Sequence, residues 1–188
     1  MRPGRRIAAP AAALAGLAVL AGCAGADYDS NLPQGCPQVS VLRDASEVTV
    51  FDGTGRDLTD VVARAAIGNY QGECDYVADP DRVEVTLILP IVAERGPASD
   101  GAVTVDYFVS VIDPDARVLA KEVFSTEIEF ETGVGRGGSI EELAQRIPLP
   151  SLGVGESYGI IVGFQLTPEQ LRYNREQMGT DAAVIGGT

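Results

Sequence analysis

Hydrophobic and polar residues alternate one by one along much of the chain. This period-two pattern is typical of β-strands that bury one face and expose the other. Alternating runs lie at 48–51, 83–91, 103–111, 124–130 and 158–166. Turn-forming residues separate the runs, most clearly at Asp113–Ala116, after which a hairpin partner begins at Arg117. The pattern predicts an all-β domain made of antiparallel strands.

One segment, residues 58–67, fits two patterns. Its apolar residues form a stripe that suits a helix with Asp57 as the N-cap. Val61, Ala63, Ala65 and Ile67 also occupy alternate positions, as the apolar residues on one face of a strand would. We favour the strand, because the glycine-bounded segment 68–72 would then serve as a turn.

Two short helices are predicted outside the strands. Ser139 and Glu142 have the spacing of a capping box, which predicts a helix that reaches Ile147. Pro168 occupies the favoured first position of a second helix, which we expect to run to about Met178.

The number and spacing of the strands resemble those of immunoglobulin-like and fibronectin-like domains. The resemblance implies one antiparallel β-sandwich domain over residues 36–178, to which the two short helices are added. The chain contains no tryptophan, so it lacks the buried tryptophan of antibody domains.

The N-terminus has the organisation of an export signal. A cationic start, residues 1–6, precedes an apolar run over 7–20. The run ends in Leu20-Ala21-Gly22-Cys23. This tetrapeptide resembles the lipobox of bacterial lipoproteins. The resemblance implies removal of the signal peptide 1–22, acylation of the Cys23 thiol, and a durable membrane anchor formed by the acyl chains.

The residues after the lipobox add detail to this assignment. Ala24, rather than an aspartate, follows Cys23, and the same resemblance then favours the outer membrane, facing the periplasm. The small polar residues of 23–35 predict a flexible tether, and the tail 179–188 lacks periodicity and is expected to be disordered. The stretch Val162–Thr167 is similar to part of a family of Gram-negative lipoproteins, a resemblance that implies no particular activity.

Two cysteines remain once Cys23 is assigned to the lipid. Cys36 and Cys74 form an even pair in an oxidising compartment, which favours a disulfide between them. A redox-active pair is disfavoured, because the two residues lack the C-x-x-C spacing.

Charge and composition exclude several classes of function. The net charge is −13 and the chain has no histidine. An acidic chain repels nucleic acid, and the absence of histidine removes Ser-His-Asp and Cys-His catalysis and histidine metal sites. We expect no cofactor, no metal and no enzymatic activity. A carboxylate-based hydrolase, using Glu127, Glu129 and Glu131 with Glu122 nearby, is the remaining enzymatic alternative.

Residues 133–138 match the glycine spacing of the dinucleotide fingerprint. No repeating strand–helix–strand pattern surrounds them, so we expect no nucleotide. Arg136, Gly137 and Gly138 precede the first predicted helix, and are instead candidates for an anion-binding or partner-contact loop. The polar segment 95–101, predicted as a hairpin loop, is a second candidate for a partner contact.

Two functions fit these observations. The first is a non-enzymatic, membrane-anchored envelope lipoprotein that contacts other envelope proteins as an interaction or assembly accessory module. The alternative is a periplasmic module that binds a ligand, an ion or a glycan. An exposed apolar patch would favour the first, and a concave pocket with converging polar groups would favour the second.

Overall fold

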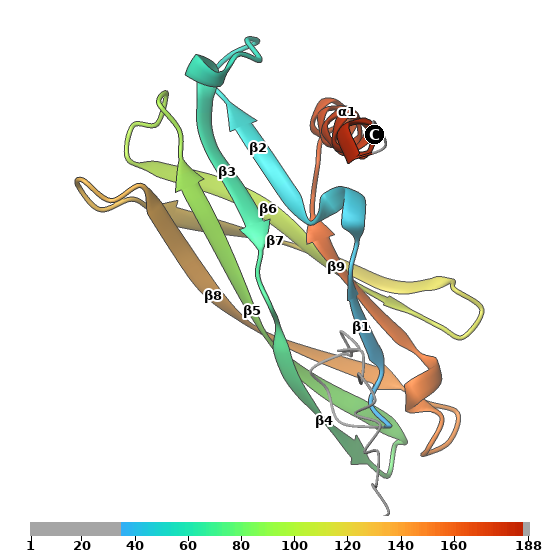
Figure 1. Ribbon diagram of the computed structural model, residues 1–188. Helices are drawn as coiled ribbons and strands as arrows, with labels where there is room; N and C mark the ends of the chain where they lie inside the picture. Colours follow the sequence, from blue (N-terminus) through green and yellow to red (C-terminus); the bar gives the residue numbers. More distant parts are fainter. Residues whose placement is uncertain (1–34, 186–188) are drawn as a thin grey trace, which may run out of the picture.

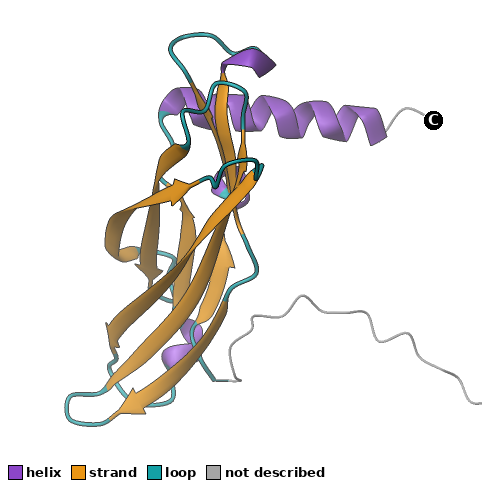
Figure 2. Cartoon of the chain, turned by 90° about the vertical axis from the view of Figure 1, so that its left-hand side faces the viewer, coloured by secondary structure: helices purple, strands orange, loops and turns teal. Residues whose placement is uncertain are grey.

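The computed structural model describes residues 35–185, and side chains as far as residue 179. Within this range, nine strands form two sheets and one α-helix follows the last strand (Figures 1 and 2). The signal peptide, the lipobox with Cys23, the tether up to residue 34 and residues 186–188 lie outside the described residues.

The first sheet is built around the long strand β5. It contains β2 (Glu47–Phe51), β3 (Val61–Ile67), β4 (Gln71–Val77), β5 (Arg82–Arg95) and β8 (Arg136–Pro148). One edge of β5 pairs with β8 along nearly its whole length, and the other edge is shared by β4 and β3. β5 therefore has a partner on both edges.

The second sheet contains four strands in the order β1, β9, β6, β7. Their bounds are β1 (Gln38–Val41), β9 (Gly159–Phe164), β6 (Ala102–Ile112) and β7 (Val118–Glu129). Every neighbouring pair in the two sheets is antiparallel except β1 and β9, which run parallel. This one pair departs from the expectation of antiparallel strands throughout.

The inward side chains of both sheets form one hydrophobic core. On β5 the odd-numbered residues from Val83 to Ala93 are all buried. Tyr107, Ile160 and Phe164 of the second sheet belong to the same core. The strands predicted from the alternation at 83–91 and 103–111 are therefore confirmed, and burial of their apolar face stabilises the two-layered arrangement.

The favoured strand in the ambiguous segment is also confirmed, since residues 61–67 form β3. Only the three residues before it are helical, as the short 3-10 helix η2 (Leu58–Asp60). Asp57 lies at its N-terminus, where its N–H donates to the Asp60 carboxylate at 3.0 Å.

β3 and β4 run in the same direction along β5, with a short gap between them. The prediction of a turn at 68–72 is therefore wrong, because the chain does not reverse there. Pro90 lies opposite the gap, and its carbonyl accepts the Gly68 N–H at 2.8 Å. The N–H and C=O of a strand residue point to the same edge of the strand. The position where Pro90 has no N–H therefore faces the gap between β3 and β4. Pairing resumes at Gln71.

The first predicted helix, from Ser139 to Ile147, is wrong, because these residues lie in β8. Leu143 and Ile147 are buried in the core, but Ile140 is 74% exposed. No capping box forms, since the Ser139 hydroxyl donates to Glu141 instead. Pairing with β5 along all of β8 outweighs the local helix signal.

The second predicted helix is present as α1 (Pro168–Ile185). The Thr167 hydroxyl accepts the Gln170 N–H at 3.2 Å, and the Gln170 side chain accepts the Thr167 N–H at 2.9 Å, which closes a capping box. The helix continues past Gly179, so the predicted end near Met178 is wrong and part of the expected tail is helical.

The chain crosses between the sheets just before β6 and just after β7, both at the open end of the β6–β7 hairpin. Residues 96–101 lead from β5 to β6, and residues 130–135 lead from β7 to β8. Since β5 and β6 belong to different sheets, the prediction of a hairpin loop at 95–101 is wrong. Asp113–Ala116 forms the turn of the β6–β7 hairpin, as predicted. The Ala116 N–H donates a hydrogen bond to the Asp113 carbonyl at 2.9 Å.

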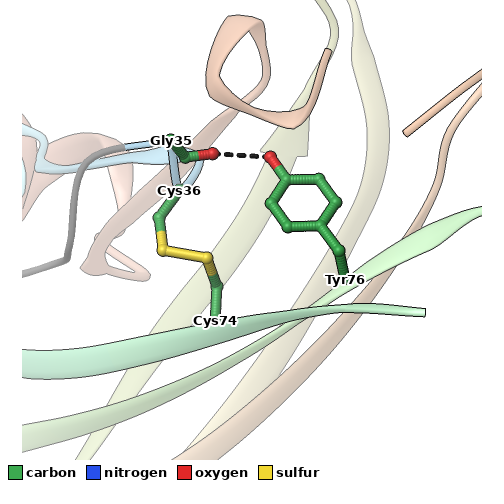
Figure 3. The surroundings of a disulfide bond; sticks show 4 residues. All are labelled: Gly35, Cys36, Cys74 and Tyr76. Atoms are coloured by element: carbon green, nitrogen blue, oxygen red, sulfur yellow. Dashed lines mark hydrogen bonds between the residues drawn. A yellow bond between two sulfur atoms is a disulfide. The ribbon is translucent and has the colours of Figure 1, made fainter. Parts of the chain in front are cut away.

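The start of the described chain is fastened to β4 (Figure 3). Cys36 and Cys74 form the predicted disulfide, with their Cα atoms 5.9 Å apart. The Tyr76 hydroxyl donates to the Gly35 carbonyl at 2.5 Å. The end of β4 and the start of β1 lie at the opposite end of the molecule from α1 (Figure 1).

Removing the disulfide should weaken the fold measurably. The bridge joins residues 38 positions apart, and opening a loop of this size costs about 4 kcal/mol of stability on the chain-entropy model. We expect the double variant Cys36→Ser, Cys74→Ser to lose about that much free energy of unfolding, measured by urea titration without reductant. Identical unfolding midpoints for the variant and the wild type would contradict this expectation.

Candidate interaction site on the edge strand β7

β7 is one of the two edge strands of the second sheet, and its first half is exposed on both faces. Val118, Leu119 and Val123 are 64%, 52% and 53% exposed. An edge strand with exposed apolar side chains is a template for pairing with another chain. This half of β7 is therefore a candidate interaction surface.

The free edge of β7 can be assigned from the hydrogen bonds of β6. The N–H of Gln165, the residue directly after β9, donates to the Asp106 carbonyl at 2.8 Å. The backbone groups of Asp106 therefore face β9. Successive residues of a strand face opposite edges, so those of Tyr107 face β7, where Phe124 lies opposite. Val123 and Ser125 therefore direct their N–H and C=O away from β6, to the free edge.

A groove of about 500 Å³ lies beside this edge. Its walls come from Leu119, Ala120 and Glu122 of β7 and from the end of β8, residues 144–148. β8 is itself an edge strand, because β5 is its only partner in the first sheet. The groove thus lies between the edges of the two sheets. A strand added to β7 would direct every second side chain toward it.

The two faces of β7 carry different groups. Lys121 places its ammonium 4.2 Å from the centre of the Phe108 ring, on the face away from the core. Glu127 and Glu129 share this face, because they occupy alternate positions after Lys121. Glu122 lies on the opposite face and lines the groove. The structure therefore separates Glu122 from the glutamates with which the sequence grouped it.

A half-buried carboxylate joins the sheets close to β7. The Tyr107 hydroxyl of β6 donates to Oε2 of Glu141 at 3.1 Å, and the Ser139 hydroxyl donates to Oε1. Thr126 of β7 also hydrogen-bonds to this carboxylate. One side chain of β8 is thus held by groups from both sheets.

Hydrogen bonding decides the charge of this carboxylate. Burial acts to raise the pKa of Glu141, but hydrogen bonds from Ser139, Thr126 and Tyr107 outweigh it and hold the pKa below its ordinary value. Burial, together with the hydrogen bond to the carboxylate and its charge, raises the pKa of Tyr107. At neutral pH the cluster therefore contains one carboxylate and a neutral phenol.

The predicted anion-binding residues lie at the start of β8. Arg136 Nη2 is 2.5 Å from Oε1 of Glu94, and no helix N-terminus follows. A Cβ on Gly137 would lie 2.6 Å from the carbonyl oxygen of Glu129, and one on Gly138 would lie 3.0 Å from a carbonyl oxygen of β5. The two glycines thus allow close approach of the strands. The predicted loop is therefore wrong, because these residues belong to a strand, and a partner contact by them stays a prediction.

The acidic turn at the tip of the β6–β7 hairpin is internally satisfied. The buried Asp113 carboxylate accepts the Arg117 backbone N–H at 2.9 Å and its Nε at 2.8 Å. The backbone and side-chain hydrogen bonds from Arg117 outweigh burial and hold the pKa of Asp113 below its ordinary value. Among residues 35–185, no three acidic or cysteine side chains gather as a metal site would require.

Comparison with protein-family models, with curated proteins and with solved structures finds no significant match to this chain. No helix in the described part of the chain is long and apolar enough to span a membrane. The candidate site is therefore interpreted from its own geometry.

Sequence reasoning missed Glu141 and the exposed half of β7. Glu141 was hidden by the assignment of its segment to a helix, although it has the same strand parity as the buried Leu143 and Ile147. The exposed half of β7 had a visible signal, because residues 118–123 do not alternate between apolar and polar.

Replacing the carboxylate should flatten the dependence of stability on pH. Because the folded pKa of Glu141 lies below its ordinary value of 4.5, its ionised form stabilises the fold above that pH. This stabilisation is lost as the pH falls through the folded pKa. We expect the unfolding free energy of Glu141→Gln, measured by denaturant titration, to fall less steeply below pH 4.5 than that of the wild type. Parallel curves would contradict this role for Glu141.

Proposed function

We propose that this protein is a non-enzymatic, membrane-anchored lipoprotein of the bacterial envelope, and that it binds a partner protein through the free edge of β7. The observation that carries the proposal is the exposed, apolar first half of β7 beside the groove between the sheet edges. An extended segment of the partner would pair with this edge as an additional strand. Main-chain hydrogen bonds would then supply affinity, and the groove would supply specificity.

The surroundings of β7 define the chemistry of the segment that fits. Its residues over Leu119 and the buried Ile147 would be apolar, and the charged Glu122 and Arg146 line the same groove. On the opposite face, the segment would meet Val123 first and then Glu127 and Glu129 further along β7. Basic residues at that end would complement the two glutamates. The proposed partner is therefore an extended segment that alternates apolar residues over the groove and ends in basic ones.

The proposed anchor is the acylated Cys23, which the lipobox-like sequence supports. A tether of residues 24–34 would join it to Gly35. Since β1 starts at the end of the molecule opposite α1 (Figure 1), tethering just before β1 would direct α1 away from the membrane. The outer membrane, with the domain facing the periplasm, is the proposed location. An immunoglobulin-like or fibronectin-like sandwich is the proposed class of fold, supported by two facing sheets with repeated crossings between them.

Loss of the acylation site should release the protein from the membrane. Two or three acyl chains on one cysteine bind durably, whereas the described residues provide no membrane-spanning helix. We expect Cys23→Ser to move from the membrane fraction to the salt-extractable fraction when cells are fractionated. A variant at the neighbouring position, Ala24→Ser, is the matched control and should remain with the membrane. Membrane retention of both variants would contradict lipid anchoring.

A proline on the free edge should weaken partner binding without disturbing the β6–β7 pairing. The N–H of Val123 points to the free edge, so Val123→Pro removes an edge donor only. We place a photo-crosslinking residue at Leu119 in living cells and quantify the captured protein. We expect Val123→Pro to reduce capture about tenfold, because an acceptor on the partner loses its donor and the proline ring obstructs the edge.

Two companion variants separate edge pairing from loss of fold or of side chain. Val123→Ala removes the side chain but keeps the N–H, and should capture the partner nearly as well as the wild type. Val123→Lys keeps the strand but places a charge at the edge, and should reduce capture as the proline does. Thermal unfolding of each purified variant verifies that it is folded. Equal capture by the alanine, lysine and proline variants would rule out edge pairing.

A further inference from the structure

A second concave surface lies away from β7, where α1 meets the outer face of the first sheet. The helix is held there by Asn174, whose side-chain N–H groups donate to the backbone carbonyls of Asp44 at 3.1 Å and Glu47 at 2.8 Å. The Tyr173 ring meets the Phe51 ring edge-on at 5.2 Å. Between the helix and β2 these contacts leave a pocket of about 420 Å³.

The pocket is lined mainly by polar groups from four parts of the fold. Arg43 comes from the short 3-10 helix η1 (Arg43–Ala45), Arg64 from β3, and Tyr173 and Gln177 from α1. Thr49 of β2 forms part of the lining and is largely buried under the helix. A pocket with convergent polar groups on rigid elements is the usual form of a site for a small ligand.

The two arginines of this pocket differ from most other described arginines. Of those others, Arg95 and Arg172 are not paired with carboxylates, whereas six are: Arg56 with Glu169, Arg82 and Arg146 with Glu84, Arg117 with Asp113 and Asp115, Arg136 with Glu94, and Arg175 with Asp44. The side chains of Arg43 and Arg64 make no hydrogen bond or ion pair with any described residue. Two guanidinium groups are thus free to bind an anion in a protein of net charge −13.

The pocket continues along the outer face of the first sheet. A second groove, of about 540 Å³, shares Glu47 and Arg64 with the pocket and extends over Ala66 and Val92. Arg64 therefore lies where a polar pocket meets a more apolar groove. A ligand that fills both is extended, carries negative charge near Arg64, and has hydroxyl groups for the amide, hydroxyl and carboxylate groups around it.

We infer that this composite surface binds an acidic oligosaccharide, with Arg64 and Arg43 on a carboxylate of the sugar and Gln177 on its hydroxyl groups. The guanidinium fork matches a carboxylate in two hydrogen bonds. The apolar face of a neighbouring sugar ring would lie on Ala66 and Val92. This site is on the opposite sheet from the free edge of β7 and does not depend on the partner proposed there.

The test is a titration of the full-length protein, purified in mild detergent and labelled with nitrogen-15, observed by NMR. The probes are an oligogalacturonate and a neutral oligogalactoside of equal length. We expect the oligogalacturonate to shift the side-chain amide signals of Gln177 and Asn174 saturably, and the neutral sugar to bind at least about tenfold more weakly, because a lost charged hydrogen bond is worth that much. Absence of saturable shifts with the oligogalacturonate would overturn the inference.

Matched variants tie the binding to the pocket. Arg64→Gln should weaken oligogalacturonate binding about tenfold, and Arg64→Lys should restore part of it by returning the charge. Arg172→Gln is the control, since Arg172 of α1 makes no ion pair with a described residue and does not line the pocket. It removes the same charge and should bind as the wild type does. If Arg64→Gln and Arg172→Gln lost the same amount of affinity for the oligogalacturonate, net charge alone would explain the loss. The inferred site would then be wrong.

Inorganic phosphate provides the last arm of the test. If phosphate alone produced the same shifts at the same concentrations, the sugar rings would contribute nothing, and the assignment to a saccharide would be wrong. Weak or absent shifts with phosphate, combined with saturable shifts for the oligogalacturonate, support an acidic saccharide.

Discussion

The burial of one face of β5 is the constraint on which the rest of the structure depends. Every odd-numbered side chain from Val83 to Ala93 is removed from water, and both edges of the strand are paired. Burial of this face requires the second sheet, since an apolar sheet face is stable only against another layer. The crossings at 96–101 and 130–135 connect the two layers at the same end of the β6–β7 hairpin, where Ala102 pairs with Glu129.

The strands of the two sheets differ in how many of their edges are paired with a neighbouring strand. β5 satisfies its backbone on both sides, whereas β7 and β8 each have one partner and face each other across a groove. The Glu141 cluster then joins β6, β7 and β8 through a charged group where a hydrophobic contact would be expected. A buried polar cluster favours one relative placement of strands, because any shift leaves its members without partners. The sheet edges are therefore held in register without being closed.

The sequence predicted the parts of this fold whose signal is local and periodic. The two-residue alternation of β5 and β6 identified both strands, and Pro168 marked the start of α1. The predictions from sequence were wrong where contacts between residues far apart in the chain determine the structure. Ile140, Leu143 and Ile147 have helical spacing, but pairing with β5 makes them a strand. The pocket under α1 was also beyond reach, because Arg43, Arg64 and Gln177 are brought together only by folding.

The fastening of Cys36 to β4 has a mechanical consequence. β1 begins two residues later and is a short strand with one parallel partner, β9. Tension applied to the segment before Gly35 would, through the backbone alone, act first on the hydrogen bonds between β1 and β9. The disulfide to Cys74 gives the same tension a covalent path into the first sheet. A pull from the N-terminal side is therefore shared between both layers, and the weakest strand does not carry it alone.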